Sequence, residues 1–78
     1  MATQKFSNVK VGAPLTAAEW RVVELVPKGR TNDEIAAALN IATETVKEHL
    51  ARVRYKLGLK NRVQLAVWVL RKGDYSFS

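Results

Sequence analysis

The chain has 78 residues, enough for one small domain with a modest hydrophobic core. It contains no cysteine, which excludes disulfide bonds, thiolate metal sites and thiol catalysis. Thirteen lysines and arginines against seven acidic residues give a net charge of +6, and no apolar run approaches the roughly 18 residues that span a bilayer. The N-terminal stretch also lacks the long apolar core of a secretory signal.

The positive charge is concentrated in the second half of the chain. Residues 1–40 hold five basic and four acidic side chains, a net of +1, whereas residues 41–78 hold eight basic and three acidic ones, a net of +5. A small basic domain of this kind favours a polyanionic partner, with nucleic acid ahead of an acidic membrane surface. Plain solubility is the simpler interpretation, so charge alone does not decide the function.

The two ends of the chain are predicted to lie outside the folded domain. Residues 1–14 show no sustained periodicity and are expected to form a flexible or extended leader. Val9 and Val11 alternate within it, which is compatible with a short extended piece lying on the domain. The tail 74–78 is predicted to be frayed, which leaves 15–73 as the domain.

Four helices are predicted between these ends, and two of them begin with the same signal. Thr16 with Glu19, and Thr31 with Glu34, have the spacing of a capping box, in which each side chain accepts from the other residue's backbone amide. Pro27 lacks an amide and disfavours helix at the residue before it, so the first helix is expected to end near there.

The second and third predicted helices are joined by a short turn around Asn40, a residue that tolerates the left-handed conformation. A connection of three to four residues is typical of a helix-turn-helix. The third helix, about 43–57, begins at Ala42, a poor cap, unless Thr43 takes over that role. Gly58 is expected to end it.

The third helix separates an apolar face from a charged one, because successive residues turn by about 100°. Val46, Leu50, Val53 and Leu57 form the predicted core stripe. The opposite face carries Glu44, Glu48, Ala51 and Tyr55. Basic side chains lie along both edges of this face. A helix of this width fits the DNA major groove, where lysine can donate to guanine and glutamate can accept from cytosine. A solvated amphipathic helix is the alternative.

The fourth predicted helix, about 62–72, begins with a third capping signal, Asn61 with Gln64. It is apolar nearly all round, and only one face is needed for the core. The apolar face that remains indicates a partner interface.

These elements together resemble a known family. The stretch from Leu15 to Leu70 is similar to the LuxR-type (LuxR/FixJ) helix-turn-helix domain of bacterial transcription regulators. The most specific part is an ordered set of residues: Asn32, Glu34-Ile35-Ala36, Leu39, Thr45-Val46-Lys47, His49, Lys56-Leu57-Gly58 and Asn61-Arg62. The resemblance implies an all-α, four-helix bundle with a central helix-turn-helix, in which the third helix reads double-stranded DNA and the fourth pairs two copies.

The resemblance also assigns roles to single residues. Those that match base-facing positions are Lys47, Glu44, Glu48 and Ala51, with Lys47 the most important. Those that match phosphate positions are Thr43, Thr45 and Lys56, while Asn61 and Arg62 match residues that contact the DNA backbone or cap the fourth helix. Arg52 and Arg54, at the edges of the charged face, are expected at phosphates as well. Those expected at a homodimer interface are Val63, Val67, Leu70 and Arg71. His49 is expected to be a semi-buried packing residue, because the chain has no second histidine and no cysteine with which to build a metal site.

Three residues depart from the family pattern. Ala18 stands where the family usually has arginine, Ala42 stands where it usually has serine, and Pro27 interrupts the end of the first helix. None of them removes a residue expected to contact DNA. They are therefore expected to affect local stability more than function.

The leading hypothesis is a sequence-specific DNA-binding module that regulates transcription as a dimer in the bacterial cytoplasm, associated with the nucleoid, with RNA polymerase as a further partner. The alternative is a protein-interaction module that docks a partner through the apolar fourth helix. No enzyme, cofactor or metal is expected, since the sequence offers no paired acids in an evident pocket. Whether the chain is free-standing or part of a longer response regulator stays open, as do its operator and its controlling signal.

Overall fold

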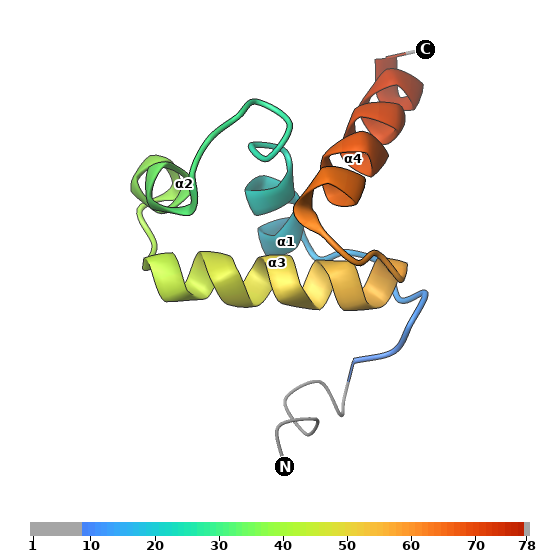
Figure 1. The fold of residues 1–78 in the computed structure, drawn as a ribbon, viewed down its shortest axis with the longest axis horizontal. Helices are drawn as coiled ribbons and strands as arrows, with labels where there is room; N and C mark the ends of the chain where they lie inside the picture. Colours follow the sequence, from blue (N-terminus) through green and yellow to red (C-terminus); the bar gives the residue numbers. More distant parts are fainter. Residues whose placement is uncertain (1–8, 78) are drawn as a thin grey trace.

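The computed structural model of the protein describes residues 9–77, and in that range it contains four helices and no strand (Figure 1). The helices are α1 (Ala17–Val23), α2 (Asn32–Leu39), α3 (Thr43–Leu57) and α4 (Arg62–Phe77). α3 packs against both α1 and α2, and α4 packs against α1. The predicted all-α fold with a central helix-turn-helix is therefore confirmed.

The helix starts follow the predicted capping signals. Both threonine capping boxes form, with Glu19 N donating to Thr16 Oγ1 at 3.1 Å and Glu34 N donating to Thr31 Oγ1 at 3.1 Å. Asn61 caps α4 by accepting from the amide of Gln64 at 2.9 Å. The Gln64 side chain accepts from the Lys60 amide at 2.7 Å, one residue further back than the predicted box.

The turn between α2 and α3 has the predicted geometry. Asn40 adopts the left-handed conformation with φ 57° and ψ 47°, and Ile41 N donates to Ala36 O at 3.0 Å. α3 begins at Thr43, so Ala42 is the N-cap and makes no side-chain hydrogen bond. Gly58 ends α3 in the left-handed conformation, with φ 68°.

Two helix ends differ from the prediction. α1 ends at Val23, about three residues earlier than predicted. Leu25 N donates to Val22 O and Val26 N donates to Val23 O, so the backbone continues in tight turns instead of an α-helix. Pro27 has no amide to continue the helical pattern. α4 continues to Phe77 instead of ending near Gly73, so the expected frayed tail is helical up to that residue and Ser78 lies outside the described range.

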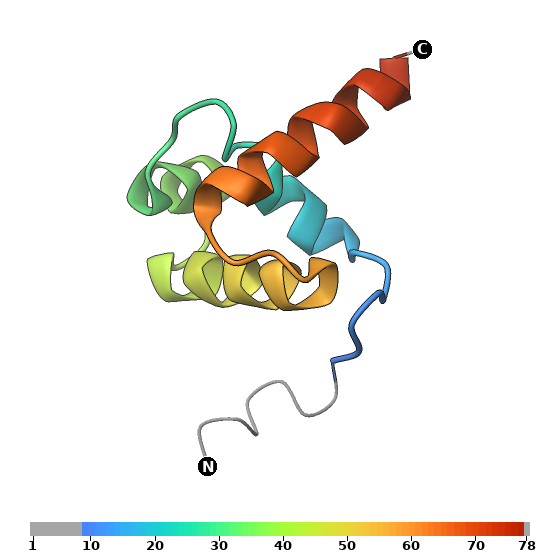
Figure 2. The same cartoon turned by 45° about the vertical axis from the view of Figure 1, so that its right-hand side comes forward.

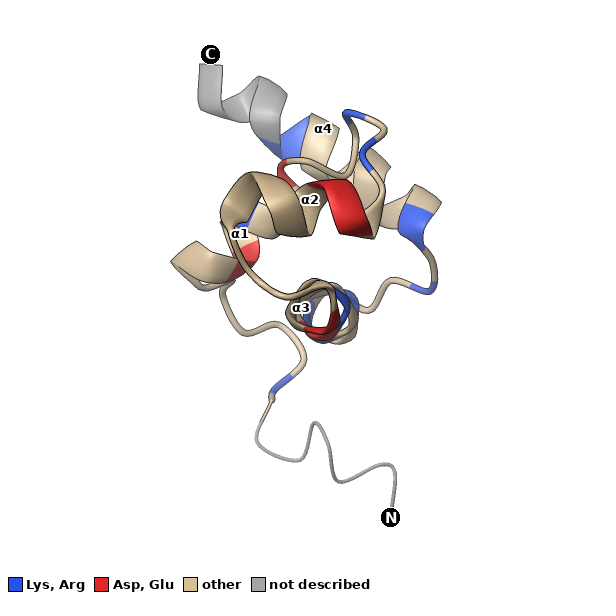
Figure 3. Cartoon of the chain, turned by 90° about the vertical axis from the view of Figure 1, so that its left-hand side faces the viewer, with Lys and Arg blue, Asp and Glu red and all other residues tan. Residues whose placement is uncertain are grey.

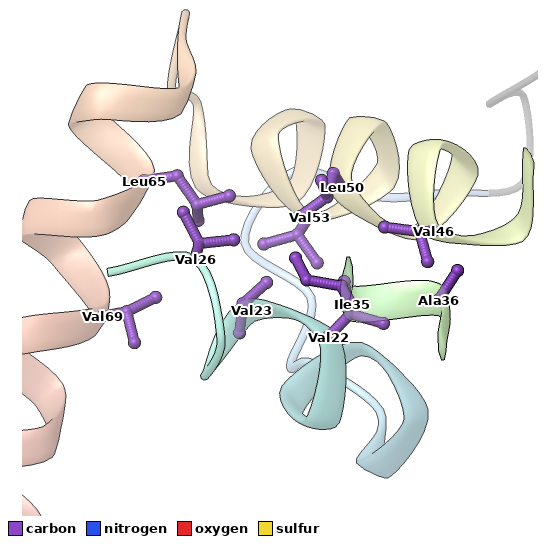
Figure 4. Packing of buried hydrophobic residues seen from close by; sticks show 10 residues of the cluster. All are labelled: Val22, Val23, Val26, Ile35, Ala36, Val46, Leu50, Val53, Leu65 and Val69. Atoms are coloured by element: carbon purple, nitrogen blue, oxygen red, sulfur yellow. The ribbon is translucent and has the colours of Figure 1, made fainter. Parts of the chain in front are cut away.

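The hydrophobic core lies where α1, α2 and α3 meet and continues to the inner face of α4 (Figure 4). The predicted α3 stripe supplies Val46, Leu50 and Val53, while Leu57 is half-buried beside them. In the part of the chain whose side chains are described, the buried apolar residues are Val22, Val23, Val26, Ile35, Ala36, Val46, Leu50, Val53, Leu65 and Val69. Trp20 of α1 stacks on Trp68 of α4 with ring centroids 5.6 Å apart, which closes the core on that side.

The arrangement leaves one side of α3 uncovered. α1, α2 and α4 lie on the same side of α3, and a view turned by 45° shows the same relation (Figures 1 and 2). The C-terminal part of α4 projects beyond the other helices. Among residues 9–77, no helix has both the length and the apolar character needed to cross a bilayer.

The missing cap on α3 generates a stability prediction. Ala42→Ser should raise the free energy of unfolding by about 1 kcal/mol, because the backbone at 42 is already extended and a serine hydroxyl would accept a first-turn amide. The melting temperature should rise by roughly 4–8 °C for a domain of this size. Ala42→Val, which adds no acceptor, is the control in thermal denaturation. An Ala42→Ser variant no more stable than Ala42→Val would contradict this account.

Candidate nucleic-acid interface

The outward face of α3 is the surface on which the predicted base-reading residues lie. Figure 3 looks along α3 and shows the other helices gathered on one side of it. Glu44 and Lys47 are exposed in the first two turns, while Glu48 and Ala51 are half-buried further along. Lys47 Nζ lies 3.4 Å from Glu44 Oε2 in an exposed ion pair. Because such pairs contribute little stability, Lys47 can exchange this partner for another at small cost.

A hollow of about 280 Å³ lies beside this face, between α3 and the starts of α2 and α4. We name it the basic hollow, since four of its lining side chains are cationic. Its lining residues are Asn32, Lys47, Leu50, Arg54, Lys60, Asn61, Arg62 and Leu65. The hollow brings together three of the predicted phosphate contacts with the main predicted base contact.

Two guanidinium groups at the basic hollow are held by hydrogen bonds. Arg62 donates from Nη1 to Asn32 Oδ1 at 2.8 Å and from Nη2 to Arg30 O at 2.7 Å. Arg54 donates from Nη1 to Lys60 O at 3.3 Å. Each guanidinium has five N–H donors, so both keep donors for an anion. Arg62 therefore joins the start of α4 to the start of α2 and still faces solvent.

Lys60 also lines the basic hollow, although no sequence motif assigns it a role. Its side chain is exposed, and its amide donates to Gln64 Oε1 in the cap of α4. The available signal was its position directly before Asn61 and Arg62, both of which were expected at phosphates.

The two threonines of the first turn of α3 are placed differently. Thr43 Oγ1 donates to Asp33 Oδ1 at 2.9 Å, so its hydroxyl proton is already engaged within the protein. Thr45 is exposed. Of the two predicted phosphate contacts, Thr45 is therefore the one whose side chain faces solvent.

Lys56 occupies a position that does not fit its predicted role at phosphate. It is only 7% exposed, and its Nζ donates to Glu19 Oε1 at 2.7 Å and to Pro14 O at 3.2 Å. Glu19 is 1% exposed, and the same Oε1 also accepts from Thr16 N at 2.9 Å. Because the lysine ammonium neutralises a buried carboxylate, it is not available to DNA, and we leave Lys56 out of the phosphate-binding set.

Arg52 lies on the flank of α3 that faces this buried pair. Its Nη2 is 3.5 Å from Glu48 Oε2, and about a third of its side chain is exposed. His49, also on this side of the helix, is half-buried, in line with its predicted packing role.

The predicted dimer residues lie on the outer face of α4. Val63, Val67 and Leu70 are 73%, 44% and 55% exposed, although all three are large apolar side chains. Their spacing of four and then three residues places them in one stripe, opposite the buried Leu65 and Val69. Arg71 is exposed at the edge of this stripe.

These elements define a helix-turn-helix domain. The short α2 supports the longer α3 across a three-residue turn, and α3 leaves a charged face open. The family described as "GerE: Bacterial regulatory proteins, luxR family" matches residues 13–69. The chain belongs to this LuxR family of bacterial regulatory proteins, which confirms the resemblance seen in the sequence. The family is one of DNA-binding transcription regulators, and it supports that general role for this domain.

Individual relatives of the chain are also named as helix-turn-helix transcriptional regulators. The chain is 39% identical to the HTH-type transcriptional regulator MalT of Cronobacter sakazakii and 42% identical to MalT of Yersinia enterocolitica, each over 66 residues. MalT of Serratia proteamaculans is also 39% identical. Each alignment covers 81% of this chain but 7% of the relative, so the chain spans only a small part of the length of these proteins.

The Glu19–Lys56 pair generates a pH prediction. Burial by itself raises the pKa of Glu19, but the hydrogen bonds from Lys56 and Thr16, with the charges of Lys56 and Arg52, outweigh it and hold the pKa below its ordinary value of 4.5. Ionised Glu19 therefore adds stability above about pH 4.5 that is lost as the pH falls through the lower pKa of the folded state.

Glu19→Gln should remove this contribution, so urea midpoints measured from about pH 6 to about pH 3 should fall less steeply than those of the unaltered chain. Glu24→Gln, a change of the same kind at an exposed position close by, should keep the original profile. If the slopes of the two variants coincide, Glu19 is not the group that confers acid sensitivity.

Proposed function

We propose that the domain binds double-stranded DNA sequence-specifically, with α3 in the major groove and α4 pairing two copies. The observation that carries this proposal is the charged side of α3 that no other helix covers (Figure 3), together with the basic hollow beside it. An α-helix fits the major groove, and its N-terminal residues meet base edges first in a helix-turn-helix.

The proposed base contacts are Lys47, Glu44, Glu48 and Ala51. Lys47 is the main one, because it is exposed on the outward face and lines the basic hollow as well. A lysine ammonium can donate to the O6 and N7 atoms of guanine, and a glutamate carboxylate can accept from the cytosine amino group. Glu44 would also repel phosphates, which restricts the poses in which α3 can enter the groove.

The proposed phosphate contacts come from the flanks of α3 and the start of α4. They are Thr45, Arg52, Arg54, Lys60, Asn61 and Arg62. The Thr43 hydroxyl can join them only if its hydrogen bond to Asp33 breaks. Contacts of this kind fix the register of the helix on the duplex and make binding salt-dependent.

The apolar stripe of Val63, Val67 and Leu70, with Arg71 at its edge, is the proposed dimer interface. Two copies joined there would present two α3 helices to two half-sites, as dimeric helix-turn-helix proteins do. For a domain with this activity we expect a location in the bacterial cytoplasm at the nucleoid, with RNA polymerase as a further partner. The second candidate function, docking of an unrelated protein on α4, rests on the same stripe.

Selection of bound sites from random duplexes tests the function as a whole, because it reports binding, half-site symmetry and spacing together. Gel filtration with DNA titration separates the two candidates. A monomer indifferent to duplex DNA would favour the protein-docking module.

Lys47→Ala should relax sequence preference. The affinity ratio between a selected duplex and a scrambled duplex should fall by roughly 5- to 150-fold, the equivalent of about 1–3 kcal/mol, because one base contact is lost. Fluorescence anisotropy measures both affinities. Lys28→Ala, at an exposed position in the loop between α1 and α2, is the charge-matched control and should leave the ratio unchanged. An unchanged ratio for Lys47→Ala would remove Lys47 from the base-reading set.

Val67→Glu should weaken dimerisation, because a carboxylate would be buried without a partner in the apolar interface. The dimer dissociation constant from sedimentation should rise by more than about tenfold. Affinity for a duplex with one half-site should stay unchanged. Gln64→Glu adds the same charge to the same helix and keeps the oxygen that accepts from Lys60 N, so it should dimerise normally. Equal dimerisation by the two variants would argue against this interface.

A further inference from the structure

Residues 9–14, which we name the leader segment, are fixed to the C-terminal end of α3. Gly12 N donates to the backbone oxygen of Lys56 at 2.7 Å, and the Lys56 side chain donates to Pro14 O at 3.2 Å. Ala13 N donates to Lys10 O at 3.1 Å, which closes a turn inside the segment. Both the backbone and the side chain of Lys56 therefore hold the leader segment in place.

The leader segment leads from the bundle toward the open side of α3. In two views it runs from beside the end of α3 to the side opposite α1, α2 and α4 (Figures 1 and 2). The view along α3 shows the same arrangement (Figure 3). Within this segment Val9 is half-buried and Lys10 is exposed. An exposed cation is thus carried to the side of the molecule on which α3 would meet DNA.

A second hollow, of about 440 Å³, lies between the leader segment and α3, and we name it the leader hollow. Its lining residues are Val9, Lys10, Ala13, Thr16, Glu19, Arg52 and Lys56. Lys56 neutralises Glu19 within it at 2.7 Å, so Lys10 and Arg52 supply its excess positive charge. Arg52 Nη2 lies 3.5 Å from Glu48 Oε2, whereas none of the acidic side chains that the structure describes, in residues 9–72, pairs with Lys10.

The two hollows lie on opposite flanks of α3. Arg54 lines the basic hollow, and Arg52 lines the leader hollow. Residues two positions apart differ by a rotation of roughly 160° about the helix axis, so these two side chains leave α3 on nearly opposite sides. The major groove is about 12 Å wide, close to the diameter of a helix with its side chains, so a helix inside it faces one sugar-phosphate strand on each flank.

We propose that the leader segment is a second DNA-contacting element, in which Lys10, together with Arg52, contacts a phosphate of the strand opposite the one at the basic hollow. This inference rests on the proposed function. It gives the buried Lys56 an indirect part in binding, since Lys56 fixes the backbone that carries the phosphate-binding lysine.

The test compares Lys10→Gln with Lys28→Gln, two exposed positions that lose the same charge. Binding of a selected duplex of about 30 base pairs is measured by anisotropy between about 50 and 200 mM salt. Lys10→Gln should bind about 4- to 10-fold more weakly at the lower salt, and the slope of log K against log salt should be less steep by about 0.9. The ratio of the affinity of the unaltered chain to that of Lys10→Gln should therefore be about 3.5-fold smaller at the higher salt.

Lys28→Gln should match the unaltered chain in both affinity and slope, and Lys10→Arg should restore both. Duplexes with a single neutral methylphosphonate, scanned along each strand, should identify one phosphate whose neutralisation weakens the unaltered chain more than it weakens Lys10→Gln, in which only Arg52 still contacts that phosphate. Equal thermal melts for the unaltered chain and Lys10→Gln exclude unfolding as the cause.

The possible failures are distinguishable. If the unaltered chain does not bind duplex DNA, both the proposed function and this inference fall. If it binds with a steep salt dependence while Lys10→Gln and Lys28→Gln behave alike, only the role of the leader segment is overturned. A methylphosphonate effect that is equally large in the unaltered chain and in Lys10→Gln at every phosphate also overturns it, because Lys10 would then contact none of them.

Discussion

The ion pair between Glu19 and Lys56 connects three parts of the structure that are far apart in the sequence. Glu19 Oε1 accepts from both Thr16 N and Lys56 Nζ, so one oxygen completes the cap of α1 and holds the end of α3. Lys56 also bonds to the leader segment through Pro14 O and through its own backbone oxygen. Removing one partner of such a pair leaves a buried charge and costs about 3–5 kcal/mol, which is a large share of the stability of a 78-residue domain.

α3 has separate structural and binding roles around its circumference. Val46, Leu50 and Val53 fix it to the core, whereas Lys47 and Glu44 remain exposed on the outside. Its basic residues also differ from one another: Arg54 and Arg52 flank the open face, while Lys56 is buried. The same helix can therefore be held rigidly and still present charge, which a reading helix needs because its side chains must meet base edges in a fixed register.

α4 connects the helix-turn-helix to a surface suited to pairing. Its start is held by Asn61 and by Arg62, which reaches Asn32 and Arg30 across the basic hollow. Its inner side contributes Leu65 and Val69 to the core, and its outer side leaves a stripe of apolar residues exposed. Because Arg62 ties α4 to the start of α2, the direction of this outer stripe is fixed relative to the rest of the helix-turn-helix.

The sequence by itself determined the helices, their caps and their buried faces, because capping boxes, the Asn40 turn and a repeat of 3.6 residues depend on neighbours only a few positions apart. The family could also be recognised from ordered local motifs. Only the tertiary structure decided the role of Lys56, since its partner Glu19 lies 37 residues away and burial cannot be read from residue type. The early end of α1, the grouping of Lys60 with Arg54 and Arg62, and the path of the leader segment likewise depend on contacts between elements, which no local pattern specifies.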